Sequence, residues 1–122
     1  MPYAGFPVWE MRGVPVVAAP EEIDMTNAAG LRAALLEAAE RGDGTLVVDM
    51  TRTRFCDMSG LHALVGAHQQ TRAGCGRALL VIPDTAVLRI VAITGIDRVI
   101  PTFATLDEAL ADVPVRRERP AG

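Results

Sequence analysis

Hydrophobic and polar positions along this chain follow two periodicities, one typical of strands and one typical of helices. Short segments rich in β-branched residues at 8–12 and 14–18, joined at Gly13, predict an N-terminal hairpin whose prolines suit the edge of a sheet. The segments 45–50 and 78–82 are compact apolar runs bounded by turn-forming or polar residues. Such runs are typical of buried central strands.

Apolar residues recur at helical spacing in three longer segments, 26–41, 59–71 and 85–94, and each segment is predicted to be a helix. Gly42 is predicted to end the first helix, because glycine readily adopts the left-handed conformation of a helix C-cap. A Thr-x-x-Glu capping box predicts a short fourth helix at 105–111.

A last short strand is predicted at residues 99–100, just before Pro101. Strands that alternate with helices predict mainly parallel central strands, packed against helices through right-handed crossovers. We therefore expect one α/β domain over residues 1–122, with a mixed sheet of about five strands and about four helices. The sheet should have a parallel centre with the hairpin at its edge. The core is expected at about 8–112, and 113–122 is expected to be a flexible tail.

Composition narrows the class of function. Half of the 122 residues are apolar, enough for one domain to bury a core without metal or disulfides. The net charge of -3 offers no basic surface for nucleic acid or an anionic membrane. Cys56 and Cys75 have neither metal-ligand spacing nor the pattern of a disulfide framework. Since neither a signal peptide nor a membrane-spanning run is visible, we expect a cytoplasmic protein.

The segment Asp57-Met58-Ser59-Gly60 follows the strand at 45–50, at the edge of the sheet where ligands and partners usually bind. Asp57 can cap the next helix, which would leave the Ser59 hydroxyl towards solvent in its first turn, with Gly60 keeping the approach open. A phosphate on Ser59 would lie near the positive end of the helix dipole and would add about -1.5 to -2 charges beside Asp57. On spacing alone, these residues favour plain helix capping over a modification site.

The chain resembles the STAS domain family, particularly its anti-sigma factor antagonists, over about residues 8 to 112. Three motifs carry the resemblance through their order and spacing. They are Glu22-Ile23-Asp24 before a Leu- and Ala-rich helix; Leu46-Val47-Val48-Asp49-Met50 leading through Phe55 into Asp57-Met58-Ser59-Gly60-Leu61; and Thr94-Gly95-Ile96-Asp97-Arg98-Val99-Ile100-Pro101. In that family the Ser before the Gly is phosphorylated by an ATP-using anti-sigma kinase. The unphosphorylated domain binds that kinase, so that a bacterial sigma factor is released.

The resemblance implies that Ser59 is the phosphorylation site, that an anti-sigma factor serine kinase is the partner, and that a separate phosphatase acts on phospho-Ser59. ATP is expected on the kinase, and no cofactor is expected on this chain. The predicted partner-binding residues are Asp24, Thr26, Asn27, Asp57, Met58, Ser59, Gly60 and His62. Asp24, Thr26 and Asn27 equally suit helix capping, and His62 could be an exposed bystander.

The chain departs from the family pattern at three places near this site. One of them is Cys56, which stands where an apolar residue is common. Met58 stands where Ser or Thr is frequent, which removes an alternative acceptor and offers a soft apolar contact. Pro20-Glu21 replaces the Gly common before the Glu-Ile-Asp element, which leaves the shape of that loop open.

Catalytic and metal-binding functions find no support in the sequence. His62 and His68 are six residues apart on one predicted helix, which is not the spacing of a metal-binding pair. Ser59 lacks the Gly-x-Ser-x-Gly elbow, no His follows His68 to complete a triad, and there is no Gly-rich phosphate loop with Lys. We therefore expect no enzyme.

Two other functions and the oligomeric state stay open. The main alternative is a non-phosphorylated STAS scaffold subunit of a transport or signalling complex. A small-ligand sensor that uses the same loop is less favoured. The sequence also leaves monomer and weak dimer open.

Overall fold

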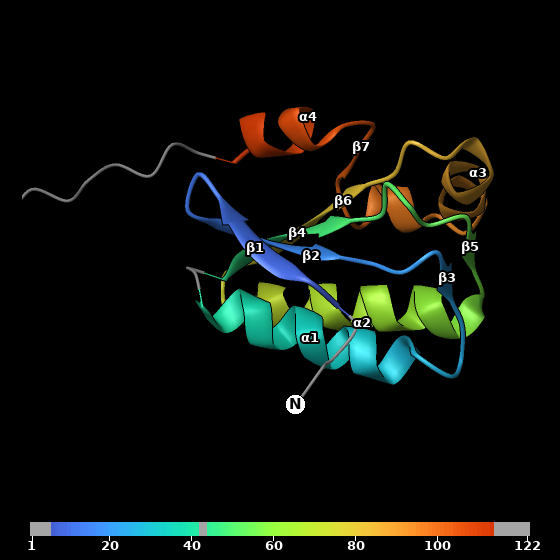
Figure 1. Cartoon of the computed structure of the whole chain (residues 1–122), viewed down its shortest axis with the longest axis horizontal. Coiled ribbons are helices and arrows are strands. Elements are labelled where there is room, and N and C mark those ends of the chain that lie inside the picture. The colour runs from blue at the N-terminus through green and yellow to red at the C-terminus, as the bar shows by residue number, and fades with distance from the viewer. Residues whose placement is uncertain (1–5, 42–43, 114–122) are drawn as a thin grey trace, which may run out of the picture.

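The computed structural model describes residues 6–41 and 44–113 of the chain (Figure 1). The elements in chain order are β1 (Val8–Met11), β2 (Val14–Ala18), β3 (Glu22–Ile23), α1 (Ala28–Arg41), β4 (Thr45–Asp49), β5 (Phe55–Cys56), α2 (Met58–Ala73), β6 (Arg77–Val81), α3 (Thr85–Ile93), the 3-10 helix η1 (Ile96–Arg98), β7 (Thr102–Phe103) and α4 (Leu106–Ala111). Gly42, the predicted helix end, and residues 114–122 of the predicted tail lie outside the described residues.

The main sheet has five strands in the order β1-β2-β4-β6-β7. Strand β1 pairs with β2 in the antiparallel sense, and every other neighbouring pair is parallel. Figure 1 shows α1 and α2 side by side on one face of this sheet and α4 on the other. The predicted mixed sheet, with a parallel centre and the hairpin at its edge, is confirmed.

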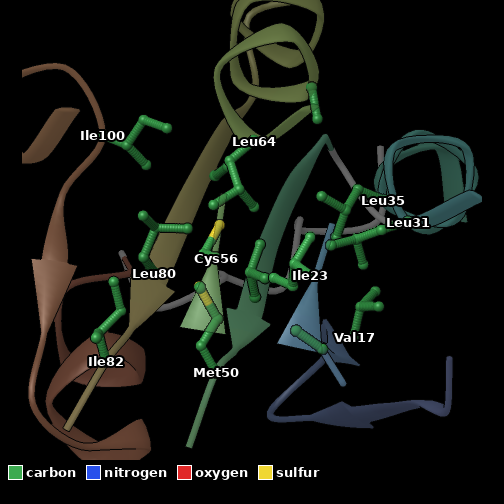
Figure 2. Packing of buried hydrophobic residues seen from close by; sticks show 14 of the residues in the cluster. Val17, Ile23, Leu31, Leu35, Met50, Cys56, Leu64, Leu80, Ile82 and Ile100 are labelled. Carbon is green, nitrogen blue, oxygen red and sulfur yellow. The ribbon is translucent and has the colours of Figure 1, made fainter. Parts of the chain in front are cut away.

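Alternate residues of the central strands face two separate cores. Leu80 points towards the helices on one face of the sheet and joins Leu31 and Leu64 in the larger core (Figure 2). Val48 belongs to the same core. Val47 and Leu79 point to the other face, where the smaller core includes residues of α4. Burial on both faces explains why these strands read as continuous apolar runs.

The hairpin turns at Arg12 and Gly13, whose φ angles are 56° and 79°. Two successive positive φ values are the requirement of a tight turn matching the twist of paired strands, and glycine meets it without strain. The sequence suggested an edge position for the prolines of the hairpin. Pro15 lies instead on β2, which is the second strand of the sheet. It faces Glu10 of β1, and the pairing of β2 with β4 begins one residue later, at Val16. The missing N–H of Pro15 therefore costs no bond to β4.

The prediction of a last strand at 99–100 is wrong, because β7 lies at Thr102–Phe103. The N–H groups of Val99 and Ile100 both donate to the carbonyl of Ile96, at 2.9 and 2.8 Å, and so belong to the turn after η1. Pairing with β6 starts only at Pro101, whose carbonyl accepts from the N–H of Leu80 at 2.9 Å. Ile100 is fully buried, so its apolar character reflects the core rather than a strand.

Candidate functional site

The site rests on a second, two-stranded sheet formed by β3 and β5, which the sequence analysis did not predict. The two strands are parallel, with Glu22 opposite Phe55 and Ile23 opposite Cys56. The N–H of Asp57 then donates to the carbonyl of Ile23 at 3.0 Å, which continues the pairing by one bond. The segments that follow β3 and β5 consequently leave the sheet side by side, and this brings the Asp24 turn to the start of α2 (Figure 1).

Asp57 is the N-cap of α2, with extended backbone angles of φ -87° and ψ -175°. Its carboxylate oxygen Oδ1 accepts from the Ser59 hydroxyl at 2.6 Å and from the Gly60 N–H at 3.0 Å. The hydrogen bond from the Ser59 hydroxyl, followed by that from the Gly60 N–H, lowers the pKa of Asp57 below its usual value. Asp57 is therefore a carboxylate at neutral pH.

Ser59 is half-buried in the first turn of α2. Its hydroxyl does not simply face solvent, as expected, but directs its proton at Asp57. A hydroxyl that donates one bond keeps its oxygen lone pairs available, so the Ser59 oxygen can still act as a nucleophile towards an approaching phosphoryl group.

Gly60 acts on the site from inside the molecule. It is buried, and a Cβ added to it would lie 2.6 Å from Cγ2 of Ile23 and 2.7 Å from Sγ of Cys56. Only a residue without a side chain lets the first turn of α2 approach β3 and β5 this closely. Gly60 therefore fixes the height of Ser59 above the β3–β5 sheet. Because Gly60 has no side chain, only its backbone can contact a partner.

Asp24, Thr26 and Asn27 form a compact turn before α1. Oδ1 of Asp24 accepts from the backbone N–H and the hydroxyl of Thr26, at 2.9 and 2.5 Å. Oδ1 of Asn27 accepts from the Asp24 N–H at 3.0 Å, and its amide donates to the Glu22 carbonyl at 2.8 Å. This turn occupies the first residues of the predicted helix, which is why α1 begins at Ala28 instead of Thr26. The three side chains thus serve as local caps, and the backbone of Met25 in the same turn contacts Asp57.

Large apolar side chains surround this polar centre. Met25, Met58 and Phe55 are 79%, 58% and 49% exposed. Met25 follows β3 and contacts Asp57 through its backbone, whereas Phe55 and Met58 flank the β5–α2 junction. Met58 was among the predicted residues, but Met25 and Phe55 were not. In β5 Cys56 points inwards and the neighbouring Phe55 points outwards, but a strand of two residues is too short for this alternation to be recognised in the sequence.

His62 is exposed one turn along α2 from Ser59. Both residues line a groove of about 460 Å³ between α1 and α2, together with Arg32 and a floor of small and apolar residues. Oε1 of Gln70, further along α2, accepts from Nη2 of Arg32 at 3.1 Å. The structure thus groups seven of the eight predicted residues around Ser59 itself: Asp24, Thr26, Asn27, Asp57, Met58, Gly60 and His62.

Cys56 and His68 do not belong to the reactive part of this site. Burial, with a smaller contribution from the Asp57 charge, raises the pKa of the Cys56 thiol to about 12, so it stays protonated. His68 is buried further along α2, away from Ser59. Within residues 6–41 and 44–113, no three His, Cys, Asp or Glu side chains are grouped to hold a metal ion. No helix in those ranges is long and apolar enough to cross a membrane.

The comparison with protein families identifies the fold. The model of the STAS domain family matches residues 8–109, and the chain belongs to this family. No curated protein matches it.

Solved structures with the same fold include anti-sigma factor antagonists. One from Mycobacterium paratuberculosis is 29% identical with a TM-score of 0.78, and the match covers 91% of this chain and 95% of that protein. SpoIIAA in its unphosphorylated form is 25% identical with a TM-score of 0.70, over 87% and 93% of the two chains. The Bacillus protein SpoIIAA in its phosphorylated form is 23% identical with a TM-score of 0.65, over 88% and 97%.

Proposed function

We propose that this chain is an anti-sigma factor antagonist. Its unphosphorylated form binds an anti-sigma factor serine kinase, so that a sigma factor is released, and phosphorylation of Ser59 switches this binding off. The observation that carries the proposal is the placement of Ser59. Its hydroxyl is bound to an ionised Asp57, at the start of α2, in the middle of exposed apolar side chains.

The surface around Ser59 suits a protein partner. Met25, Met58 and Phe55 expose apolar area that water solvates poorly, and association would bury it. The polar groups among them are already bonded to one another, as in the Asp24 turn and the Asp57 cap. A partner can therefore cover this surface without leaving those buried polar groups unsatisfied. Support from relatives is independent of this geometry, since SpoIIAA is named an anti-sigma factor antagonist and its structure is known in an unphosphorylated and a phosphorylated form.

A phosphate on Ser59 would change this surface in three ways. It would remove the hydroxyl proton donated to Asp57 and place about two negative charges beside that carboxylate. It would also compete with Asp57 for the N–H groups of the first helical turn. Finally, it would put a bulky hydrated group among Met25 and Met58. The interface would then be lost through local charge and desolvation, without unfolding of the domain.

In this proposal, other proteins catalyse the transfer of phosphate to Ser59 and its removal. The chain supplies the acceptor hydroxyl and the docking surface, the kinase supplies ATP, and a separate phosphatase restores Ser59. The regulated process is sigma-dependent transcription, and the proposed site of action is the cytoplasm.

A phosphoryl-transfer assay tests this proposal. The anti-sigma kinases encoded in the same genome would be purified and each incubated with radiolabelled ATP and the wild-type chain, Ser59→Ala or Thr51→Ala. One kinase should label the wild type and Thr51→Ala but not Ser59→Ala. Thr51 is the matched control because it is an exposed hydroxyl-bearing residue outside the predicted partner-binding residues.

Two results would contradict the proposal. Labelling of Ser59→Ala as strong as that of the wild type would assign the phosphate elsewhere. Failure of every kinase both to bind and to label the chain would favour the alternative of a non-phosphorylated scaffold subunit.

A further inference from the structure

A second polar site lies towards the other end of α2, nine residues beyond Ser59 and about 13 Å further along the helix. It is a cavity of about 600 Å³ between the last turns of α2, the start of β6 and the segment after η1. Its lining residues are His68, Gln69, Arg72, Arg77, Val99 and Pro101. The proposed kinase-binding function uses none of them.

His68 is the unusual member of this cavity. Its side chain is only 6% exposed, and within the described residues Nδ1 is the one buried side-chain nitrogen or oxygen without a hydrogen-bond partner. A buried polar atom without a partner is costly, and such atoms in folded proteins generally find a protein group, water or ligand. Since the His68 ring forms part of the cavity wall, a ligand in the cavity could supply the missing partner.

Two guanidinium groups give the cavity its charge. Arg72 lies one turn after His68 on α2, and among the described residues it makes no ion pair. Nη2 of Arg77 binds Oδ2 of Asp112 at 2.7 Å, but a guanidinium has further N–H donors that one carboxylate oxygen does not use. Burial, followed by the positive charge of Arg72, lowers the pKa of His68; the backbone of Val99 raises it, and Arg77 lowers it further. Both arginines therefore act on the ring as positive charges.

The C-terminal end of a helix carries a partial negative charge, which would oppose the binding of an anion near the end of α2. Here two carbonyls in the last turn of α2 are already occupied. The carbonyl of Thr71 accepts from the N–H groups of Gly74 and Gly76, at 3.1 and 2.7 Å, and that of Arg72 accepts from Cys75 at 2.9 Å. Because these two acceptors are satisfied within the turn, they oppose an anion less than free carbonyls would.

We propose that this cavity binds a phosphate-type anion, held by the guanidinium groups of Arg72 and Arg77 and by the ring of His68. Paired arginines suit phosphate because their N–H donors match its oxygens. The apolar rim of Val99 and Pro101 leaves room for the organic part of a small phosphate ester, so free phosphate and a phosphomonoester are the two sources of this chemistry. The site is separate from Ser59 and does not depend on the phosphorylation switch.

The test is a titration of the full chain followed by NMR, with inorganic phosphate in one arm, glycerol 3-phosphate in a second and sodium chloride of matched ionic strength in a third. The signals of the His68 ring and of the Arg72 and Arg77 side chains should shift saturably with one or both phosphates and not with chloride. Saturation by the ester alone would identify the phosphomonoester as the source.

Variants distinguish a built site from general attraction. Arg72→Gln and Arg77→Gln should each weaken binding by about 10- to 100-fold, as expected for the loss of hydrogen bonds to a charged group. Asp112→Asn is the matched control for Arg77, because it breaks the same ion pair but keeps the cation, and it should leave binding unchanged or tighter. His68→Gln should weaken binding, whereas His62→Gln, at the Ser59 end of α2, should not.

The proposal is overturned if neither phosphate shifts these signals beyond the chloride control. It is equally overturned if saturable binding survives in both arginine variants, while the amide spectra show that the variants are folded.

Discussion

The two ends of helix α2 differ in how their polar groups are satisfied. At the Ser59 end, Asp57 accepts from two donors, the Asp24 turn bonds to itself, and the surface left to solvent is rich in apolar side chains. At the His68 end, a buried ring nitrogen has no partner among the described residues, and two arginines face a cavity. The first arrangement suits a protein partner and the second suits a small anion. One helix can therefore carry two kinds of binding site, because local hydrogen bonding decides which polar groups at each end remain without a partner.

The largest expected effect concerns the charge at Ser59. Ser59→Asp should bind the cognate kinase about 10- to 1,000-fold more weakly than Ser59→Ala, since each tenfold step corresponds to about 1.4 kcal/mol. Calorimetric titration of both variants with the purified kinase measures this ratio. Ala111→Asp, which adds the same charge on exposed α4 across the sheet, is the matched control and should bind like the wild type. Equal affinities of the two Ser59 variants would remove the switch.

The next largest effect is a difference in stability between alanine substitutions at the two glycines of α2, Gly60 and Gly66. Gly60→Ala should lower the free energy of unfolding by about 1–3 kcal/mol, because its Cβ would meet Ile23 and Cys56 at 2.6 and 2.7 Å in the core. Gly66→Ala should be neutral or stabilising by up to about 1 kcal/mol, because its Cβ would meet only the flexible end of Arg32 at 3.1 Å.

Urea unfolding followed by circular dichroism measures both glycine variants. A Gly60→Ala protein as stable as Gly66→Ala would show that close packing does not position the start of α2.

A smaller effect is expected from protonation of His68. Burial and the nearby Arg72 hold the pKa of His68 below its usual value of 6.5, although the backbone of Val99 acts in the opposite sense. The unfolded chain therefore binds a proton at a higher pH than the folded chain. The stability that the folded state gains from keeping His68 neutral is present above about pH 6.5. It is lost as the pH falls through the lowered pKa of the folded state.

Unfolding measured between pH 7.5 and 5 should therefore show the wild type losing stability relative to His68→Gln. His62→Gln should follow the wild type over the same range. A wild type and His68→Gln with parallel pH profiles would contradict the assignment.

The smallest expected effect is the pH dependence of the Asp57 cap. Hydrogen bonds from the Ser59 hydroxyl and the Gly60 N–H lower the pKa of Asp57 below 3.8, so its contribution to stability is present above that value and is lost as the pH falls through the lowered pKa. Asp57→Asn can still cap the helix but cannot titrate. The difference in stability between the wild type and Asp57→Asn should shrink on acidification from pH 5 to pH 2, and a constant difference would mean that the carboxylate is not bound as described.

Hydrophobic periodicity was enough to predict the mixed main sheet with its parallel centre and the helices between its strands. The prediction from periodicity failed where elements were short. Strands β3 and β5 have two residues each, too few for any period to show, and they are held by pairing between distant segments. The apolar residues Val99 and Ile100 were read as a strand, although their amides close the turn after η1.

The candidate site was predictable only in part for a similar reason. The Asp57 cap follows from local sequence chemistry, and the role of Ser59 rests on the family motif. The inward contact of Gly60, the exposed Met25 and the unpartnered His68 all depend on segments that the fold brings together. Side-chain partners of this kind are decided by tertiary packing and leave no pattern in one sequence.

The most direct test of the account is the phosphorylation state of the native protein. The chain would be isolated from its own cells with phosphatase inhibitors present, and its intact mass and modified positions would be determined by mass spectrometry in growing and stressed cultures. The account predicts a species with one added phosphate, located on Ser59, whose proportion changes with the condition. A protein that carries no phosphate in any condition, or carries it on another residue, would contradict the account.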